Sequence, residues 1–168
     1  ADEWARLEKV LVLEDRGPRR PAVLDRSLVG KTASTILRRI GVEVPESVRL
    51  AVAPLPVDHP LLWTEQMMPV MPLCSVPDAD TAMDLAVEME GGNGHTFVMH
   101  SRRVDRLSRM ARLCNASIFV KNGPNHAGLG AGGEGPTSFT IATPTGEGLT
   151  DARSFSRRRR CTLVGEFR

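Results

Sequence analysis

The sequence predicts an α/β fold in which helices cover a parallel sheet. Between residues 70 and 121, short apolar runs of strand length alternate with longer runs whose apolar residues recur with the period of a helix. The order strand, helix, strand, helix, strand at this spacing is typical of βαβ units. After residue 122 the chain becomes rich in Gly and Pro, and two later runs alternate like strands. The end of the chain is therefore predicted to form β arms added to the α/β body.

The N-terminal part is predicted to contain two helices separated by a loop. Residues 2–9 suit a short helix, and Gly-Pro-Arg-Arg-Pro-Ala at 17–22 predicts a loop. From Ala33 to Ile40, apolar residues stand at i, i+3, i+4 and i+7, which places them on one stripe of a second helix. Gly41 then occupies a position that favours a left-handed C-cap.

Two strands are predicted next. Residues 48–54 alternate between apolar and less apolar side chains and predict a strand that ends at Pro54. Residues 71–76 form a second apolar run. Pro72 within it predicts the start of a strand or an edge position, because Pro has no N–H for the ladder.

The following helix is expected to begin at a cap supplied by Asp78 or Asp80 and to stop at Gly91 and Gly92. Residues 96–100 then predict a strand. Ser101 is expected to cap a further helix that ends near Asn115, and residues 117–121 predict another strand. The apolar face of this second helix is expected to carry Val104, Leu107, Ala111 and Cys114.

Beyond residue 122, strands are predicted at residues 138–142 and 159–164. Gly128 to Gly133 match the pattern GxGxxG, but a dinucleotide loop of this kind requires a helix immediately after it. Pro136 and a strand-like run follow instead, so we interpret these glycines as a tight packing turn. Arg157 to Arg160 are interpreted as an edge-strand feature that discourages unwanted pairing.

Composition excludes several classes of partner. The formal net charge is +2, from 22 basic and 20 acidic residues, and this balance argues against a nucleic-acid partner. No apolar run is long enough to span a membrane, so no membrane partner is expected. The cysteines, Cys74, Cys114 and Cys161, are scattered, which indicates reduced thiols in a cytoplasmic compartment and no zinc site.

Two short segments are candidates for ligand binding. Residues 121–124, Lys-Asn-Gly-Pro, close a predicted parallel strand at its carboxyl end, where ligands bind in open α/β sheets. Turn chemistry explains the same residues equally well. Glu65 stands in a loop ahead of a strand, where a carboxylate can accept hydrogen bonds from ribose hydroxyls. Taken alone, an ordinary surface glutamate is the default interpretation of Glu65.

Several motifs in fixed order resemble one family. Residues 64–70, Thr-Glu-Gln-Met-Met-Pro-Val, are similar to the Glu-Leu-Met-Met-Pro-Val stretch of CoA-acylating propionaldehyde and acetaldehyde dehydrogenases. These enzymes serve bacterial microcompartments and belong to the aldehyde dehydrogenase superfamily. The likeness runs from about Ser27 to the end of the chain, whereas residues 1–26 match poorly. Further similar segments lie at residues 95–101, 117–124, 127–135, 137–141, 144–148 and 159–164.

The resemblance implies a division of the chain. Residues 27–136 would form the C-terminal part of an aldehyde dehydrogenase catalytic domain, and residues 137–168 would form an extended oligomerisation arm. In the family, a cysteine thiolate attacks the aldehyde, hydride passes to NAD, and coenzyme A takes the acyl group from the resulting thioester. The family's nucleophilic cysteine and its nucleotide-binding domain lie upstream of everything present here, so no catalytic residue is assigned in this chain.

The resemblance also implies binding residues. Glu65 matches the glutamate that contacts the nicotinamide ribose of NAD, and Met67 matches a neighbour lining that end of the site. Asn122, Gly123 and Pro124 match residues that line the acyl pocket. Cys161 matches a position in a C-terminal strand far from the chemistry.

Two functions are therefore weighed. In the first, the chain is the C-terminal part of an NAD-dependent acylating aldehyde dehydrogenase and is inactive by itself. In the second, it is a non-catalytic truncated paralogue that acts in binding or assembly. The expected partners are a small aldehyde, coenzyme A and either a second copy joined through the C-terminal arm or an N-terminal dehydrogenase segment. The expected location is the cytoplasm or a bacterial microcompartment.

Overall fold

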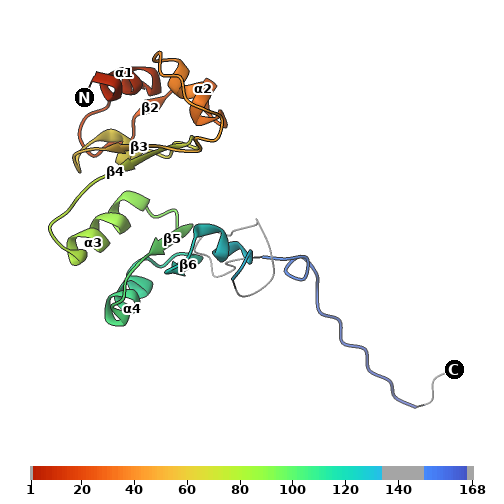
Figure 1. The fold of residues 1–168 in the computed structure, drawn as a ribbon. Coiled ribbons are helices and arrows are strands. Elements are labelled where there is room, and N and C mark those ends of the chain that lie inside the picture. The colour runs from red at the N-terminus through yellow and green to blue at the C-terminus, as the bar shows by residue number, and fades with distance from the viewer. Residues whose placement is uncertain (1, 134–149, 166–168) are drawn as a thin grey trace. The chain divides into compact units, whose positions relative to one another are not determined.

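A computed structural model describes residues 2–133 and 150–165 of the chain (Figure 1). The chain divides into two compact units, Ala1–Ala82 and Met83–Arg168. The described strands form three two-stranded sheets, of which one is antiparallel and two are parallel. The predicted α/β class with parallel strand pairs is thereby confirmed. The predicted domain boundaries after residues 26 and 136 stay predictions.

The first unit begins with a helix and ends with a parallel strand pair. Its core is a cluster of aliphatic side chains that includes Leu11, Leu28, Ile36 and Leu61, each of which is fully buried or nearly so. In chain order its elements are α1 (Asp2–Leu11), β1 (Val12–Glu14), β2 (Val23–Leu24), the 3₁₀ turn η1 (Arg26–Leu28), α2 (Ala33–Arg38), β3 (Ala51–Pro54), the 3₁₀ turn η2 (Pro60–Trp63) and β4 (Val70–Leu73).

The parallel pair β3–β4 is shorter than the sequence predicts. Ala51 stands opposite Val70, and the ladder closes with the Leu55 N–H donating to the Leu73 carbonyl at 2.7 Å. Strand β3 therefore begins at residue 51 rather than 48, and β4 ends at residue 73 rather than 76, because pairing ceases there. Among the described residues β4 pairs only with β3, so Pro72 does occupy an edge strand.

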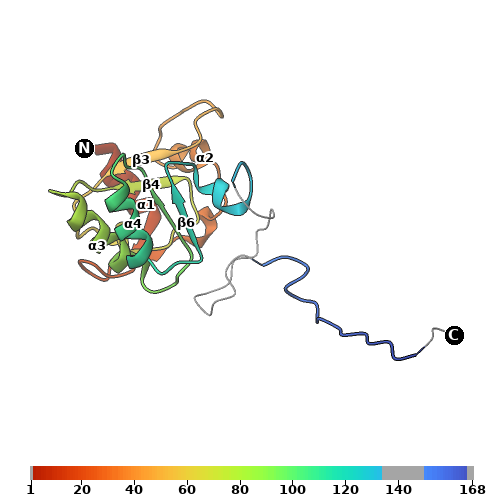
Figure 2. The same ribbon diagram turned by 90° about the horizontal axis from the view of Figure 1, so that it is seen from below.

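The second unit contains the predicted parallel βαβ arrangement. Its elements are α3 (Ala79–Glu90), which begins just before the unit boundary, β5 (Thr96–Met99), α4 (Val104–Leu113), β6 (Ile118–Lys121) and the 3₁₀ turn η3 (Asn125–Leu129). Strands β5 and β6 are parallel, with Thr96 opposite Ile118. Figure 2 shows α3 and α4 on one side of β6 and η3 on the other. Strand β4, which precedes α3, pairs with β3 of the first unit.

Helix α3 starts and stops where the sequence predicts. The Asp78 side chain accepts a hydrogen bond from the Thr81 N–H at 2.8 Å, and Gly91 follows the helix with a φ of 69°. The left-handed conformation at Gly91 is the one that a C-terminal glycine adopts without steric penalty.

Helix α4 differs from prediction in its cap and in its buried face. Ser101 does not cap it: the Ser101 hydroxyl accepts from the Arg103 N–H, and the helix begins at Val104 without a side-chain cap. Leu107, Met110 and Cys114 form the buried face, whereas Val104 and Ala111 are exposed. In the first turn, hydrogen bonds from Arg103 lower the pKa of Asp105 to about 2.

The glycine-rich segment after β6 packs against that strand. A Cβ atom on Gly128 would overlap the Ile118 side chain, and one on Gly133 would overlap the Ala127 carbonyl. Gly128 lies in the 3₁₀ turn η3, and no α-helix follows it within residues 129–133. The segment is therefore a packing turn in the described structure, as interpreted from the sequence.

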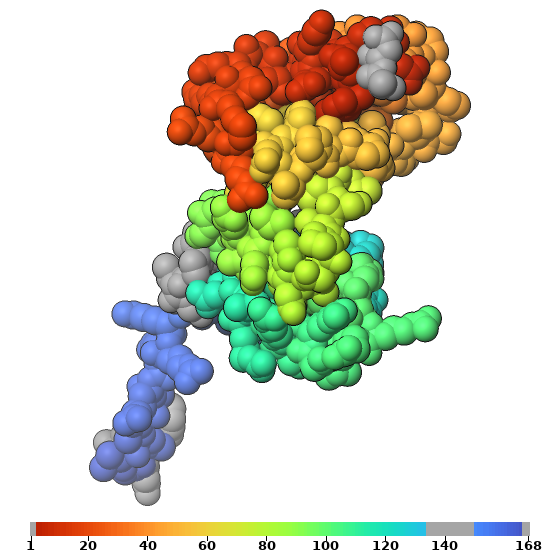
Figure 3. Space-filling model, turned by 90° about the vertical axis from the view of Figure 1, so that its left-hand side faces the viewer, coloured from red at the N-terminus to blue at the C-terminus, as the bar shows by residue number. Residues whose placement is uncertain are grey.

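The described part of the C-terminal region contains no regular structure. Residues 150–165 form neither helix nor strand, and residues 152–165 are exposed (Figure 3). The strand predicted at residues 159–164 is therefore wrong for this chain, which offers that segment no paired neighbour among the described residues. The strand predicted at 138–142 lies outside the described residues. No helix of the described chain has the length and apolarity that crossing a membrane demands.

Candidate functional site

The loop between η2 and β4 presents Glu65 and Met67. Glu65 is exposed, and Met67 is 70% exposed with a φ of 52°, a left-handed conformation that is uncommon for a residue other than Gly. The Gly30 N–H donates to the Met67 carbonyl at 3.2 Å and holds this turn against the segment before α2. The loop is thereby fixed while both side chains stay accessible.

A hollow of about 710 Å³ lies beside this loop. Glu65 and Met67 line it together with the guanidinium-bearing side chains Arg16 and Arg26. A carboxylate accepts hydrogen bonds from vicinal hydroxyls, and guanidinium groups bind anions. The hollow therefore brings together groups that suit a polar, negatively charged ligand with a sugar, and the Arg16 guanidinium also pairs with the Glu14 carboxylate at 3.2 Å. Its remaining lining residues are Ala22, Val23, Leu24, Val29, Thr64 and Gln66.

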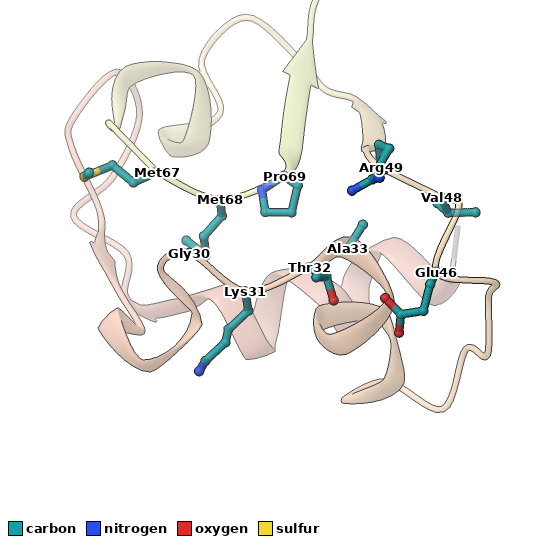
Figure 4. A pocket seen from close by; sticks show the side chains of 10 residues that line it. All are labelled: Gly30, Lys31, Thr32, Ala33, Glu46, Val48, Arg49, Met67, Met68 and Pro69. Carbon is teal, nitrogen blue, oxygen red and sulfur yellow. The ribbon is translucent and has the colours of Figure 1, made fainter. Parts of the chain in front are cut away.

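A second hollow, of about 360 Å³, lies along the same loop (Figure 4). Thr32 and Glu46 form part of its polar wall, and the buried Ser34 hydroxyl links them. This hydroxyl donates to the Glu46 carboxylate at 2.9 Å and shares a hydrogen bond with the Thr32 hydroxyl at 2.9 Å. Met67 lines both hollows, and Figure 4 shows its side chain pointing away from the other labelled residues. Met67 therefore stands between the two hollows.

Asn122 closes the carboxyl ends of β5 and β6. Its side-chain oxygen accepts from the Ser101 N–H at 2.7 Å, and its side-chain nitrogen donates to the Ser101 carbonyl at 2.9 Å. Its backbone N–H donates to the Met99 carbonyl at 2.9 Å, and its φ is 54°. The side-chain amide of Asn122 therefore uses both of its polar atoms to join the end of β6 to the segment that follows β5. Gly123 is half-buried and Pro124 is exposed directly before η3.

Two replacements of Asn122 distinguish the contribution of its two side-chain hydrogen bonds with Ser101, here called the Asn122 clamp, from the contribution of its left-handed backbone conformation. Asn122→Gly removes both side-chain hydrogen bonds but tolerates the positive φ, and because Asn122 is exposed it is expected to lower the free energy of unfolding by about 1 kcal/mol. Asn122→Ala should lower it by roughly 1–2 kcal/mol more, because Ala disfavours the left-handed region. Urea denaturation checks both values. Equal stability of the Asn122→Gly variant and the original chain would contradict the clamp.

The three thiols lie in different environments. Cys74 is half-buried just after β4, not within a strand as predicted. Cys114 is buried at the end of α4, where its sulfur lies 3.8 Å from the Ala111 carbonyl. Cys161 is exposed in the described part of the C-terminal region. Among the described residues, no group of His, Cys, Asp and Glu side chains is arranged to hold a metal ion.

His59, which no sequence motif indicates, caps a turn of the first unit. The His59 Nδ1 accepts from the Leu61 N–H at 3.2 Å and so caps η2, while its Nε2 lies 2.9 Å from the Glu8 carboxylate. Because Nδ1 is an acceptor here, Nε2 carries the proton and donates it to Glu8. The His59-Pro60 pair ahead of an apolar run is the only sequence signal for this cap. His59 thus fixes the turn from which the Glu65 loop leaves.

The candidate residues form two separate groups. Glu65 and Met67 share one loop and one hollow of the first unit. Asn122, Gly123 and Pro124 are consecutive at the carboxyl end of β6 in the second unit.

Comparisons with known proteins match the whole chain to part of larger enzymes. It is 49% identical over its full length to acetaldehyde dehydrogenase (acetylating) EutE of Salmonella typhimurium, of which it covers 36%. It is 49% identical over 86% of its length to a propanal dehydrogenase (CoA-propanoylating) of Citrobacter freundii, of which it covers 32%. The chain thus spans about a third of the length of these relatives. No family model matches it.

Solved structures give the same result. The propionaldehyde dehydrogenase of Rhodopseudomonas palustris with bound propionyl-CoA is 45% identical, with a TM-score of 0.85 over 97% of this chain and 35% of that one. A propionaldehyde dehydrogenase from the fucose utilisation microcompartment of Clostridium phytofermentans is 39% identical, with a TM-score of 0.82 over 96% of this chain and 36% of that one. An engineered glycolyl-CoA reductase with bound NADP⁺ is 45% identical, with a TM-score of 0.85.

Proposed function

We propose that the chain supplies the C-terminal part of the catalytic domain of a CoA-acylating aldehyde dehydrogenase, because it is similar along its full length to about a third of such enzymes. The observation that carries the proposal is similarity at 49% identity over the full length of the chain, with the Glu65 loop inside the matched region. The reaction converts an aldehyde, coenzyme A and NAD to acyl-CoA, NADH and a proton. Its nucleophile is a cysteine of a segment outside these 168 residues.

The described residues fit a nicotinamide dinucleotide. Glu65 offers an exposed carboxylate at the rim of a hollow that also contains Arg16 and Arg26. In the proposal, Glu65 accepts hydrogen bonds from the nicotinamide ribose and Met67 packs beside that end of the site. When bound, NAD supplies the acceptor for the hydride of the aldehyde carbon. We propose NAD as the cofactor, whereas NADP⁺ is bound in one of the similar structures.

Asn122, Gly123 and Pro124 line the acyl pocket in this proposal. The clamp between Asn122 and Ser101 suits that task, because it ties the start of the loop after β6 to the segment that follows β5. Rigid placement of pocket walls favours a defined orientation of a small acyl group. In this proposal the substrate is a small aldehyde and the place of action is the cytoplasm or a bacterial microcompartment, and one of the similar structures is an enzyme from such a microcompartment.

A coupled pair of assays tests the proposal. The chain alone, given propionaldehyde, NAD and coenzyme A, is expected to produce no NADH. The completed enzyme, in which the chain is joined to the segment of a full-length relative that it does not cover, is expected to produce NADH and propionyl-CoA. NADH absorbance and chromatography of the thioester are the measurements. An inactive but folded completed enzyme would favour a non-catalytic role in binding or assembly.

We further propose that the chain self-associates through its C-terminal arm. Residues 152–165 are exposed and include the large apolar side chains Phe155, Leu163 and Val164. Exposed apolar side chains on an unpaired segment favour association with a second copy. Multi-angle light scattering at micromolar concentration is expected to show a dimer or larger species, and removal of residues 150–168 should yield a monomer. A monomer before truncation would count against the arm.

A further inference from the structure

The Thr64 hydroxyl connects three segments of the first unit. Its oxygen accepts from the Ala22 N–H at 2.8 Å, and its proton is donated to the Pro60 carbonyl at 2.7 Å. The hydroxyl therefore bridges the residue before β2 and the first residue of η2 at the point where the Glu65 loop begins. Ala22 is buried and Thr64 is half-buried, so water does not readily replace these bonds.

Two more hydrogen bonds hold the rest of the loop. The Gln66 amide donates to the Leu61 carbonyl at 2.9 Å, and the Met67 carbonyl accepts from the Gly30 N–H at 3.2 Å. Residues on both sides of Glu65 are thus attached to the body of the unit, while Glu65 itself is exposed. This arrangement fixes the backbone of Glu65 and leaves its carboxylate available.

We propose that Thr64 is a positioning residue that sets the orientation of the Glu65 carboxylate for the cofactor ribose. The inference rests on the proposed function, because it assumes that Glu65 contacts the cofactor. Thr64 differs from Gln66 in making two hydrogen bonds rather than one, and the side-chain oxygen of Gln66 is buried without a partner in the described structure. Of these two side-chain attachments, Thr64 makes more hydrogen bonds, and we expect its removal to affect the loop more than removal of the Gln66 amide.

The test begins with the chain itself. Thr64→Val keeps the shape of the side chain and removes the hydroxyl, Thr64→Ala removes it without a branched side chain, and Thr64→Ser restores it. In both variants without a hydroxyl, the Ala22 amide is expected to exchange faster with solvent and the Glu65 amide to show a lower NMR order parameter. Thr64→Ser should retain the original values. An unchanged Glu65 order parameter in Thr64→Val and Thr64→Ala would overturn the inference.

The second arm uses the completed enzyme. Thr64→Val is expected to raise KM for NAD about tenfold, which corresponds to about 1.4 kcal/mol of lost orientation, with KM for coenzyme A unchanged and rescue by Thr64→Ser. A purely structural role would lower the active fraction and kcat without this selective change. If Glu65→Gln raises KM for NAD and Thr64→Val does not, the positioning role is wrong and the proposed function survives. If Glu65→Gln also leaves KM for NAD unchanged, the proposed contact of Glu65 with NAD fails.

Discussion

Glu65→Gln in the completed enzyme is expected to raise KM for NAD at least about tenfold, the effect of losing hydrogen bonds worth roughly 1.5–3 kcal/mol to a charged acceptor. The amide retains the size of the side chain but is uncharged and replaces one acceptor oxygen by a donor, so it cannot accept a hydroxyl hydrogen bond on each of its two terminal atoms. Because Glu65 is exposed, its replacement should not change the free energy of unfolding by more than about 0.5 kcal/mol. The effect is therefore expected on binding and not on folding.

Glu43→Gln is the matched control for this experiment. Glu43 is an exposed carboxylate of the same unit, 3.5 Å from Arg38, and it lines neither hollow beside the Glu65 loop. Its replacement removes the same charge and should leave KM for NAD unchanged. Steady-state kinetics at varied NAD concentration compare the variants. Similar changes in both would mean that charge in general, rather than Glu65 in particular, affects the cofactor.

Gly128→Ala is expected to destabilise the second unit by about 3 kcal/mol, because its new Cβ would overlap the Ile118 side chain on β6. The turn cannot move away freely, since Gly133 packs equally closely on the Ala127 carbonyl. Gly123→Ala is the control, because a Cβ there would lie 3.4 Å from the nearest Val120 atom. That control should change the free energy of unfolding by less than about 1 kcal/mol. Urea denaturation measures both changes.

A double variant assigns this destabilisation to a single contact. Ile118→Ala removes the Cγ2 methyl group that the new Cβ would overlap and leaves the Val120 Cγ2 atom, 3.0 Å away, in place. Gly128→Ala should therefore be less harmful in that background than in the original chain. The expected coupling is about 1 kcal/mol or more. Strictly additive effects would show that Gly128 is needed for some reason other than its contact with Ile118.

Local signals in the sequence predict part of this fold well. The cap at Asp78 and the stop at Gly91 follow from side chains close in sequence to the helix ends, and the parallel pair β5–β6 follows from the order strand, helix, strand in one continuous segment. Features that depend on distant partners are predicted less well. Strand β4 ends where its pairing with β3 ends, and the predicted strand at residues 159–164 has no partner among the described residues. The partner of a strand cannot be identified from the sequence of that strand alone.

The candidate site residues show the same difference between local sequence signals and contacts with distant partners. The sequence could identify Glu65 and the segment 122–124 only through resemblance, because a surface glutamate and an Asn-Gly-Pro turn are common. It gave no sign that the Asn122 amide would bind both backbone groups of Ser101, which lies 21 residues away. The sequence did not predict the structural roles of Thr64 and His59 for a similar reason, since their partners Ala22 and Glu8 are also distant in sequence.

Acyl-group mapping tests most directly whether this chain works with a nucleophile supplied from outside it. The completed enzyme is incubated with propionyl-CoA, which transfers its acyl group to the reactive thiolate and releases coenzyme A, and is then digested and examined by mass spectrometry. We expect a propionyl thioester on a cysteine of the added segment and none on Cys74, Cys114 or Cys161. A propionyl group on any of these three thiols, formed also by the chain alone, would contradict this expectation.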